Sequence, residues 1–191
     1  MSTNSLGTVS FSRMDEATVG DYEVLGRYEG EMLSDLPDRL LQAVDALEHS
    51  LGGFKVTRKE HSLQSATRAI QDGRSEEYVV AALLHDIGDL LAPHTHGEMV
   101  GAILRPFVAP DICWLVKYHG LFQTYYYGHL TGGDRYARER FKDHPNYEAC
   151  IEFCEKYDQN CFDPEFEPLP LEHFEPIVRR VFSEPRYLDR E

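Results

Sequence analysis

The sequence lacks long apolar runs and is poor in positive charge. No window approaches the length of a membrane span, and Met1 to Glu16 lacks the basic start and apolar run of a secretory signal. The 19 Lys and Arg residues are outnumbered by 33 Asp and Glu, which gives a formal net charge of −14. Because nucleic acids and anionic membranes attract basic surfaces, we expect neither as a partner.

Cysteine is also scarce, and its spacing matches no metal or redox motif. The four cysteines are Cys113, Cys150, Cys154 and Cys161, and no two of them form a Cys-x-x-Cys pair. We interpret them as reduced packing residues of a cytoplasmic protein. The nine histidines, in contrast, provide enough ligands for a metal site.

The periodicity predicts one all-α domain. A chain of 191 residues suffices for one full core, and no convincing pair of strands is present. Residues 1–14 are polar and are expected to be a flexible segment, followed by a single domain over residues 15–191. Glycines predict irregular structure over 15–33 and a loop over 120–133. Helices are expected at about 37–51, 57–71, 75–86, 95–104, 110–119, 134–142, 146–159 and 171–182.

The most informative stretch is an apolar run from Val79 to Leu84 that leads directly into His85-Asp86. The run indicates a buried helix, so the polar pair at its end lies where water is scarce. A buried carboxylate beside a buried imidazole is costly unless both are satisfied. A metal ion satisfies both, and imidazole with carboxylate suits iron, manganese, zinc or nickel. The structural alternative is a His–Asp hydrogen bond that ends a helix.

Further polar residues recur within the other predicted helices. One residue from each helix, directed to the middle of a bundle, is how helical proteins build buried metal sites. The candidate set exceeds what one ion needs, so two ions bridged by Asp86 is the simplest interpretation. The candidate ligands are His61, His85, Asp86, His96, His119 and Asp158.

The order of these six residues resembles that of the HD-domain superfamily, in particular its branch of mixed-valent diiron oxygenases that cleave phosphonates. The resemblance covers roughly residues 28–158 and implies an all-α HD-domain bundle around a dinuclear iron site. It assigns one iron to His61, His85, Asp86 and Asp158, and the other to the bridging Asp86 with His96 and His119. Phosphohydrolases of the superfamily use much the same ligands.

The resemblance also gives a role to Tyr28-Glu-Gly-Glu31. In the phosphonate-cleaving branch a Tyr-x-x-Glu precedes the first ligand histidine, and its tyrosine caps an iron at rest while the glutamate holds it. Tyr28 would therefore be a displaceable metal ligand and Glu31 its partner. One difference is the gap from Tyr28 to His61, which is longer than in the family. The structural alternative is a surface loop with a packed tyrosine.

Substrate contacts are predicted from three places. Asp89 stands where family members often carry His or Lys, and an acid there implies contact with a positively charged group. The stretch from His119 through Gln123 to the tyrosines at 125–127 offers aromatic faces, which bind quaternary ammonium with about 0.5–2 kcal/mol per ring. Arg135 or Arg138 could bind a phosphonate through a planar guanidinium. The structural alternatives are a helix-end residue for Asp89, packing for the tyrosines, and surface charges for the two arginines.

Together these features predict a diiron oxygenase that uses dioxygen to cleave the carbon–phosphorus bond of a small 1-hydroxyphosphonate. The sequence from His119 to Asp158 resembles that of enzymes that act on (R)-1-hydroxy-2-(trimethylammonio)ethylphosphonate. The products of that reaction are glycine betaine and phosphate. The amino-substituted substrate stays open, as does the oligomeric state. The alternatives are a metal-dependent phosphohydrolase acting on a nucleotide or small phosphate ester, and a non-catalytic metal-binding module.

Overall fold

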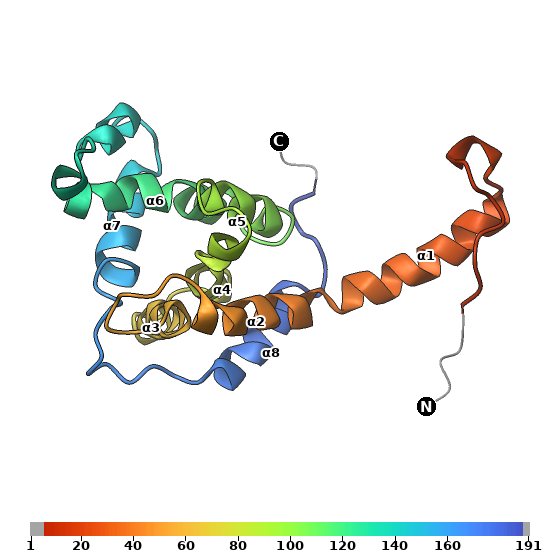
Figure 1. Cartoon of the computed structure of the whole chain (residues 1–191), viewed down its shortest axis with the longest axis horizontal. Helices are drawn as coiled ribbons and strands as arrows, with labels where there is room; N and C mark the ends of the chain where they lie inside the picture. The colour runs from red at the N-terminus through yellow and green to blue at the C-terminus, as the bar shows by residue number, and fades with distance from the viewer. Residues whose placement is uncertain (1–5, 189–191) are drawn as a thin grey trace.

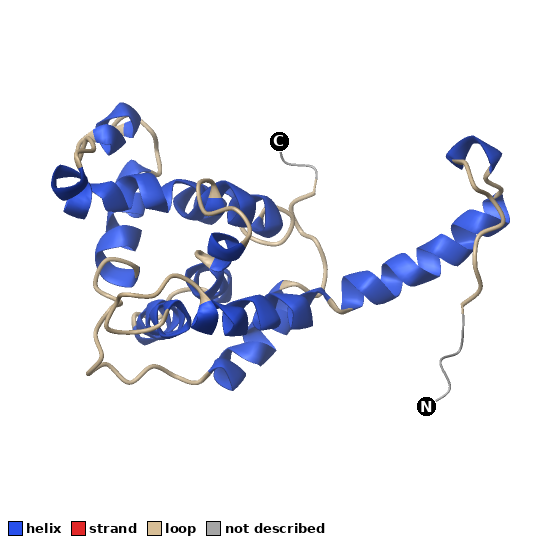
Figure 2. Ribbon diagram, viewed as in Figure 1, coloured by secondary structure: helices blue, strands red, loops and turns tan. Residues whose placement is uncertain are grey.

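The computed structural model describes residues 6–188, which fold into helices joined by loops, with no strand among them (Figures 1 and 2). The α-helices are α1 (Val19–Ser34), α2 (Leu36–Ala46), α3 (Arg58–Gln71), α4 (Glu76–Leu84), α5 (His96–Leu104), α6 (Pro110–Thr131), α7 (Tyr147–Tyr157) and α8 (Leu171–Val181). Short 3-10 helices lie at η1 (Met14–Glu16), η2 (Leu47–His49), η3 (Ile87–Leu90) and η4 (Ala137–Phe141). The all-α prediction is confirmed.

Helix α4 is the centre of the core. Ser75 caps its first turn by accepting a hydrogen bond from the Tyr78 amide, and every residue from Tyr78 to Leu84 is buried. The helix packs against α3, α6 and α8, so it is apolar all round rather than amphipathic. The helix ends at Leu84 and His85 is its C-cap, so the His-Asp pair lies at the buried C-terminal end of α4.

The region of residues 15–33, expected to be irregular, is instead mostly the helix α1. Thr18 and Asp21 form a capping box at its start. Each internal glycine weakens a helix by about 1 kcal/mol relative to alanine, but does not end it unless its φ is positive. None of Gly20, Gly26 and Gly30 has a positive φ.

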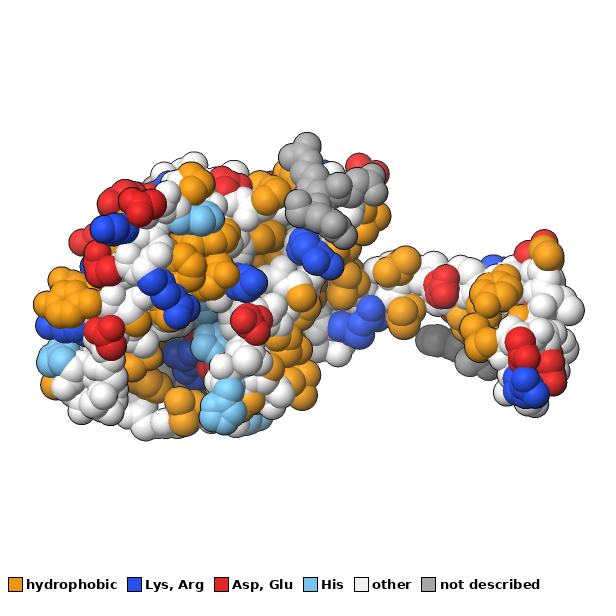
Figure 3. All heavy atoms as spheres, turned by 90° about the horizontal axis from the view of Figure 1, so that it is seen from above, with side chains coloured by type: hydrophobic (Ala, Val, Ile, Leu, Met, Phe, Trp, Pro, Cys, Tyr) orange, Lys and Arg blue, Asp and Glu red, His pale blue; other side chains and the backbone are white. Residues whose placement is uncertain are grey.

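Helix α1 projects away from the body formed by the other helices (Figures 1 and 3). The preceding chain folds back along it, because the amide and hydroxyl of Ser10 donate to the Asp21 carboxylate. Several large apolar side chains on α1 are exposed: Val19, Tyr22, Tyr28, Met32 and Leu33. The predicted flexible segment 1–14 lies partly outside the described residues, and its mobility stays a prediction.

The predicted loop at 120–133 is also helical, because α6 continues without a break to Thr131. Gly120 lies inside the helix, where a Cβ atom would come within 3.4 Å of the His96 ring. The glycine therefore gives room to a neighbouring side chain instead of ending the helix. Gly132, with φ of 76°, ends it in the left-handed conformation. The predicted helix at 134–142 is only the 3-10 helix η4.

Within the described residues, no helix has the length and apolar character needed to cross a membrane.

The close approach of α5 and α6 depends on Gly97, and we expect Gly97→Ala to destabilise the protein. A Cβ there would lie 2.7 Å from the Lys117 carbonyl oxygen and 2.8 Å from that of Val116. Backbone cannot yield as a side chain can, so the expected loss is about 1–3 kcal/mol of unfolding free energy, measured by urea denaturation.

Gly101→Ala, one turn further along α5, is the matched control. Its new Cβ would meet the side chain of Lys117 at 3.3 Å, and the helix propensity of alanine offsets part of that contact. We expect a clearly smaller change than for Gly97→Ala. Equal stability of the Gly97→Ala variant and the unmodified protein would contradict this account.

Candidate metal centre

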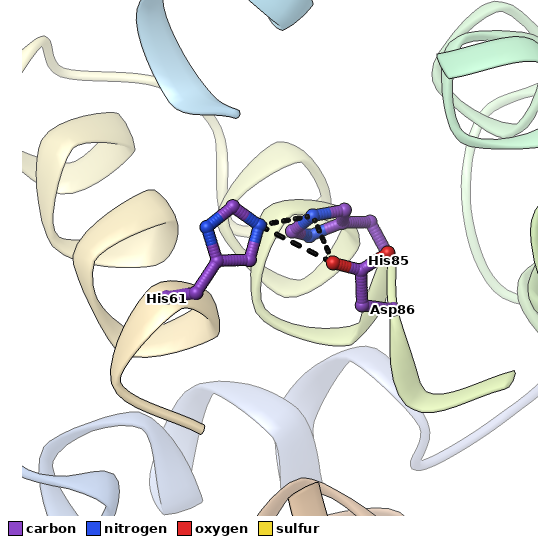
Figure 4. A group of neighbouring side chains, drawn as sticks. All are labelled: His61, His85 and Asp86. Atoms are coloured by element: carbon purple, nitrogen blue, oxygen red, sulfur yellow. Dashed lines mark hydrogen bonds and ion pairs between the residues drawn. The ribbon is translucent and has the colours of Figure 1, made fainter. Parts of the chain in front are cut away.

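Four imidazoles from four helical segments converge at the C-terminal end of α4. His61 comes from α3, His85 follows the last residue of α4, His96 begins α5, and His119 lies in the middle of α6. Three of them are buried, and His96 is 22% exposed. Figure 4 shows His61, His85 and the adjacent Asp86 directed toward one another.

The backbone fixes the orientation of three rings. The Nδ1 atom of His61 lies 3.0 Å from the carbonyl of Cys161, that of His85 lies 2.7 Å from Ala82, and that of His119 lies 2.6 Å from Val116. A carbonyl only accepts hydrogen bonds, so each Nδ1 carries the proton. The Nε2 lone pairs are left to face the centre, which is the tautomer that metal-binding histidines use.

The Nε2 atoms approach one another in two pairs. They are 3.0 Å apart between His61 and His85, and 3.1 Å apart between His96 and His119. Two lone pairs at such distances repel unless a proton or a cation lies between them. The geometry therefore favours a positive charge between the rings of each pair.

Asp86 lies between the two pairs and presents one oxygen to each. Its Oδ2 atom is 3.2 Å from Nε2 of His61 and 3.0 Å from that of His85. Its Oδ1 atom is 3.6 Å from Nε2 of His96 and 3.4 Å from that of His119. This is the arrangement of a carboxylate that bridges two ions.

Asp158 adds a second carboxylate on the His61 side. It directly follows the last residue of α7, and its Oδ1 atom is 3.5 Å from Nε2 of His61. Gln123 donates from its side-chain amide to the same oxygen. The buried Oδ2 atom of Asp158 has no hydrogen-bond partner among the described residues. A buried carboxylate oxygen without a partner is a costly feature that a cation would satisfy.

Electrostatics indicate the same need for cations. Burial alone would lower the pKa of His61, but the Asp158 and Asp86 carboxylates outweigh it and raise the pKa to about 9. The pKa of His119 also rises to about 9, because Asp86 outweighs the effect of burial. Without an ion, protons on these rings would neutralise the carboxylates. A metal ion has to displace those protons.

The residues present therefore fit two metal ions. One set of donors is His61, His85 and Asp86, and a second set is Asp86, His96 and His119. Asp158 lies within reach of His85 and His119 and 3.5 Å from His61. Neutral imidazole with carboxylate suits iron among other transition metals. His94, only two residues from His96, is exposed and outside the cluster.

A cavity of about 410 Å³ opens onto this cluster. Its volume lies within the usual range of small-molecule sites, roughly 300–1,000 Å³. Three aromatic side chains, Phe54, Tyr127 and Phe162, line its wall. The candidate ligands Asp86, His96, His119 and Asp158 also line the cavity, so a small molecule inside it can reach the cluster.

Of the predicted substrate contacts, Asp89 and Gln123 line the cavity. Asp89 is already engaged, since it accepts hydrogen bonds from Arg58 and its Oδ1 atom lies 3.4 Å from Nδ1 of His96. Arg135 and Arg138 do not line the cavity. Their guanidinium carbons lie 4.6 and 3.6 Å from the centre of the Tyr125 ring.

Tyr28 and Glu31 are not brought to the cluster. Both lie on the projecting helix α1, and the Tyr28 hydroxyl donates to the carbonyl of Gly7 at 2.9 Å. For Tyr28 to ligate a metal, helix α1 would have to take a different position relative to the histidine and aspartate cluster. Its role as a ligand stays a prediction.

Sequence reasoning missed Arg58, whose guanidinium donates to both Asp86 and Asp89. A signal was available. Arg58 precedes His61 by three residues on a predicted helix, so the two side chains share one face. Phe54 and Phe162 were also missed, because they lie in loops without periodicity.

The model of the HD domain family matches residues 46–159, more than half of the chain and a range that contains all six candidate ligands. The protein therefore belongs to the HD domain family, and the predicted fold and family are confirmed. It is related to the [1-hydroxy-2-(trimethylamino)ethyl]phosphonate dioxygenase (glycine-betaine-forming) of Leisingera caerulea. The two are 31% identical over 160 residues, which cover 68% of this chain and 81% of the relative.

We expect the protein to bind two metal ions per chain, with an affinity that increases as the pH rises toward about 9. Below that pH, His61 and His119 hold protons that a metal has to displace, so binding releases protons. Calorimetric titration with ferrous iron, without oxygen and in buffers of different ionisation enthalpy, measures both affinity and proton release.

His96→Ala and His94→Ala form a matched pair for this titration. The first removes a donor of the second group and should leave about one tightly bound ion. The second removes an exposed imidazole two residues away and should leave both. Equal loss of metal in the two variants would contradict the assignment of His96.

Proposed function

We propose that this protein is a diiron oxygenase that cleaves the carbon–phosphorus bond of a 1-hydroxyphosphonate. The observation that carries the proposal is the Asp86 carboxylate between two groups of metal donors, in the lining of a cavity of small-molecule size. The relationship to a trimethylamino-substituted phosphonate dioxygenase supports the reaction type and the class of substrate, and donors of imidazole and carboxylate suit iron.

The proposed substrate is (R)-1-hydroxy-2-(trimethylammonio)ethylphosphonate. Dioxygen is consumed, the C1–P bond breaks, and C1 becomes the carboxylate carbon of glycine betaine while phosphorus leaves as phosphate. One dioxygen accepts the four electrons that C1 loses, and both its oxygen atoms enter the products. No outside reductant is needed. The two irons would supply the site at which dioxygen is activated.

The residues of the chain would bind and orient this substrate. Phe54 and Tyr127 in the aromatic wall provide ring faces for a quaternary ammonium group, which has no hydrogen to donate. Phe162 stacks against both Phe54 and His61 and supports this wall. Gln123 has a buried side-chain oxygen without a partner among the described residues, and that oxygen could accept the hydrogen bond of the C1 hydroxyl.

We expect the iron-loaded protein to release phosphate from this substrate only when dioxygen is present, with oxygen uptake equal to phosphate release. Stopped assays with and without air, on protein of known iron content, measure both. The 2-amino analogue tests the substituent, and the trimethylammonio substrate should have the lower KM because of the aromatic wall. Equal phosphate release without dioxygen would replace the oxygenase by the phosphohydrolase alternative.

Tyr28 is proposed as the displaceable metal ligand and Glu31 as its holder. A phenolate bound to ferric iron absorbs visible light, so Tyr28→Phe should remove a visible band of the oxidised, iron-loaded protein without loss of iron. Tyr22→Phe is the matched control, because Tyr22 is another exposed tyrosine of α1. Absence of the band from the unmodified protein would remove Tyr28 from the ligand set.

A further inference from the structure

We propose that Arg58 binds the phosphonate oxygens of the substrate and that Asp89 positions it. The proposal rests on the proposed function, since it takes the substrate to carry a phosphonate. It assigns the anion-binding role to a residue outside the ligand set, and not to Arg135 or Arg138.

The position of Arg58 follows from the start of α3. Thr57 and Glu60 form a capping box that begins the helix, and Arg58 is its first residue. His61 follows one turn later on the same face, so Arg58 points toward the metal centre. Its side chain is 12% exposed and lines the cavity.

Rings and carboxylates together hold the guanidinium. The Cζ atom of Arg58 lies 5.7 Å from the centre of the Phe54 ring and 5.8 Å from that of Phe162. Its Nε and Nη2 atoms donate to Oδ2 of Asp89 at 3.2 and 3.0 Å, and Nη2 also donates to Asp86. A guanidinium held in this way has lost most of its side-chain freedom before any ligand arrives.

Arg58 nevertheless keeps donors for a ligand. None of the hydrogen bonds formed within residues 6–188 uses its Nη1 group, which carries two N–H donors. Ligation of Asp86 by metal would also compete for the oxygen that Nη2 contacts. The planar fork of arginine matches two oxygens of a phosphonate.

The charges of the cavity make such a cation necessary. Three carboxylates, those of Asp86, Asp89 and Asp158, line the same cavity and would repel an anionic substrate. Among the described residues of its lining, Arg58 is the one Lys or Arg. Besides the metal ions, Arg58 is therefore the group that can attract a phosphonate there.

Asp89 has a clear role in this arrangement. Both of its oxygens are engaged, Oδ2 by Arg58 and Oδ1 by His96 at 3.4 Å. It therefore orients the cation and one metal-binding ring, and we take it as a positioning residue and not as the contact for the substrate's ammonium group.

The test is the affinity of iron-loaded protein for methylphosphonate, a phosphonate without the C1 hydroxyl, measured by calorimetry without oxygen. Arg58→Met keeps the side-chain length and removes the charge. We expect its affinity to fall by about tenfold to a hundredfold, the loss typical of charge-assisted hydrogen bonds. KM for the hydroxyphosphonate should rise by a similar factor. Unchanged affinity and KM at equal iron content would overturn the proposal.

Two further variants control for folding and charge. Arg74→Met removes a partly buried arginine that pairs with Glu152 away from the cavity, and it should lower stability without changing methylphosphonate affinity. Arg58→Lys covers the case in which Arg58→Met does not fold. It keeps the charge but not the fork, and we expect a fewfold loss. Equal affinities of Arg58→Lys and the unmodified protein would overturn recognition by the fork.

A double-mutant cycle tests the role of Asp89. In the Arg58→Met background, Asp89→Asn removes a repulsive charge and weakens the contact with His96, but it no longer affects an arginine, so it should strengthen methylphosphonate binding. In the unmodified background it also loosens Arg58, so its effect should be less favourable. Equal effects in both backgrounds would overturn the positioning role.

Failure of this inference and failure of the proposed function give different results. If the unmodified protein releases no phosphate in air but binds methylphosphonate through Arg58, the oxygenase is wrong and the anion site stands. If it turns over the hydroxyphosphonate and Arg58→Met does so with the same KM, the oxygenase stands and the anion site is wrong.

Discussion

The structure depends on keeping the Asp86 carboxylate charged inside the core. Burial favours its neutral form, but His85 and Arg58 hold its pKa well below the usual range. Such a charge is tolerated only where positive groups surround it on several sides. Those groups come from α3, the end of α4, α5 and α6, so four segments must meet at one point. The bundle is arranged around that requirement.

Backbone geometry delivers the rings to this point. The carbonyl groups of Ala82 and Val116 lie three residues before His85 and His119, and each accepts the hydrogen bond of the ring that follows it. His96 is placed differently, by space that glycine leaves. A Cβ atom at Gly88 would lie 2.8 Å from the backbone of His96, and Gly120 faces its ring. Hydrogen bonds to the backbone thus orient the three buried rings, whereas close packing and the nearby Asp89 carboxylate position the partly exposed one.

The sequence could predict the buried part of the site better than the parts that depend on close packing. The apolar run before His85 requires burial, so the core helix and the buried His-Asp pair could be read directly from it. The remaining candidate ligands, His96 among them, came from the resemblance of their order to that of the HD-domain superfamily. The course of α1 and α6 could not be read in the same way, because a glycine that breaks a helix and one that admits a neighbour look alike in sequence. Arg58 was missed because arginine at a helix start is ordinarily a surface residue.

The ligand set fixes the class of site more firmly than the reaction. The same histidines and aspartates suit either an oxygenase or a phosphohydrolase, so the choice between substrates has to come from the wall of the cavity. That wall is built from Phe54 before α3, Arg58 at its start, Asp89 in η3, Tyr127 on α6 and Phe162 after α7. None of these residues belongs to the buried core around α4. The aromatic part of the wall can therefore change its shape without disturbing the bundle, whereas Arg58 also stabilises the buried Asp86 carboxylate and is tied to the fold as well as to the cavity.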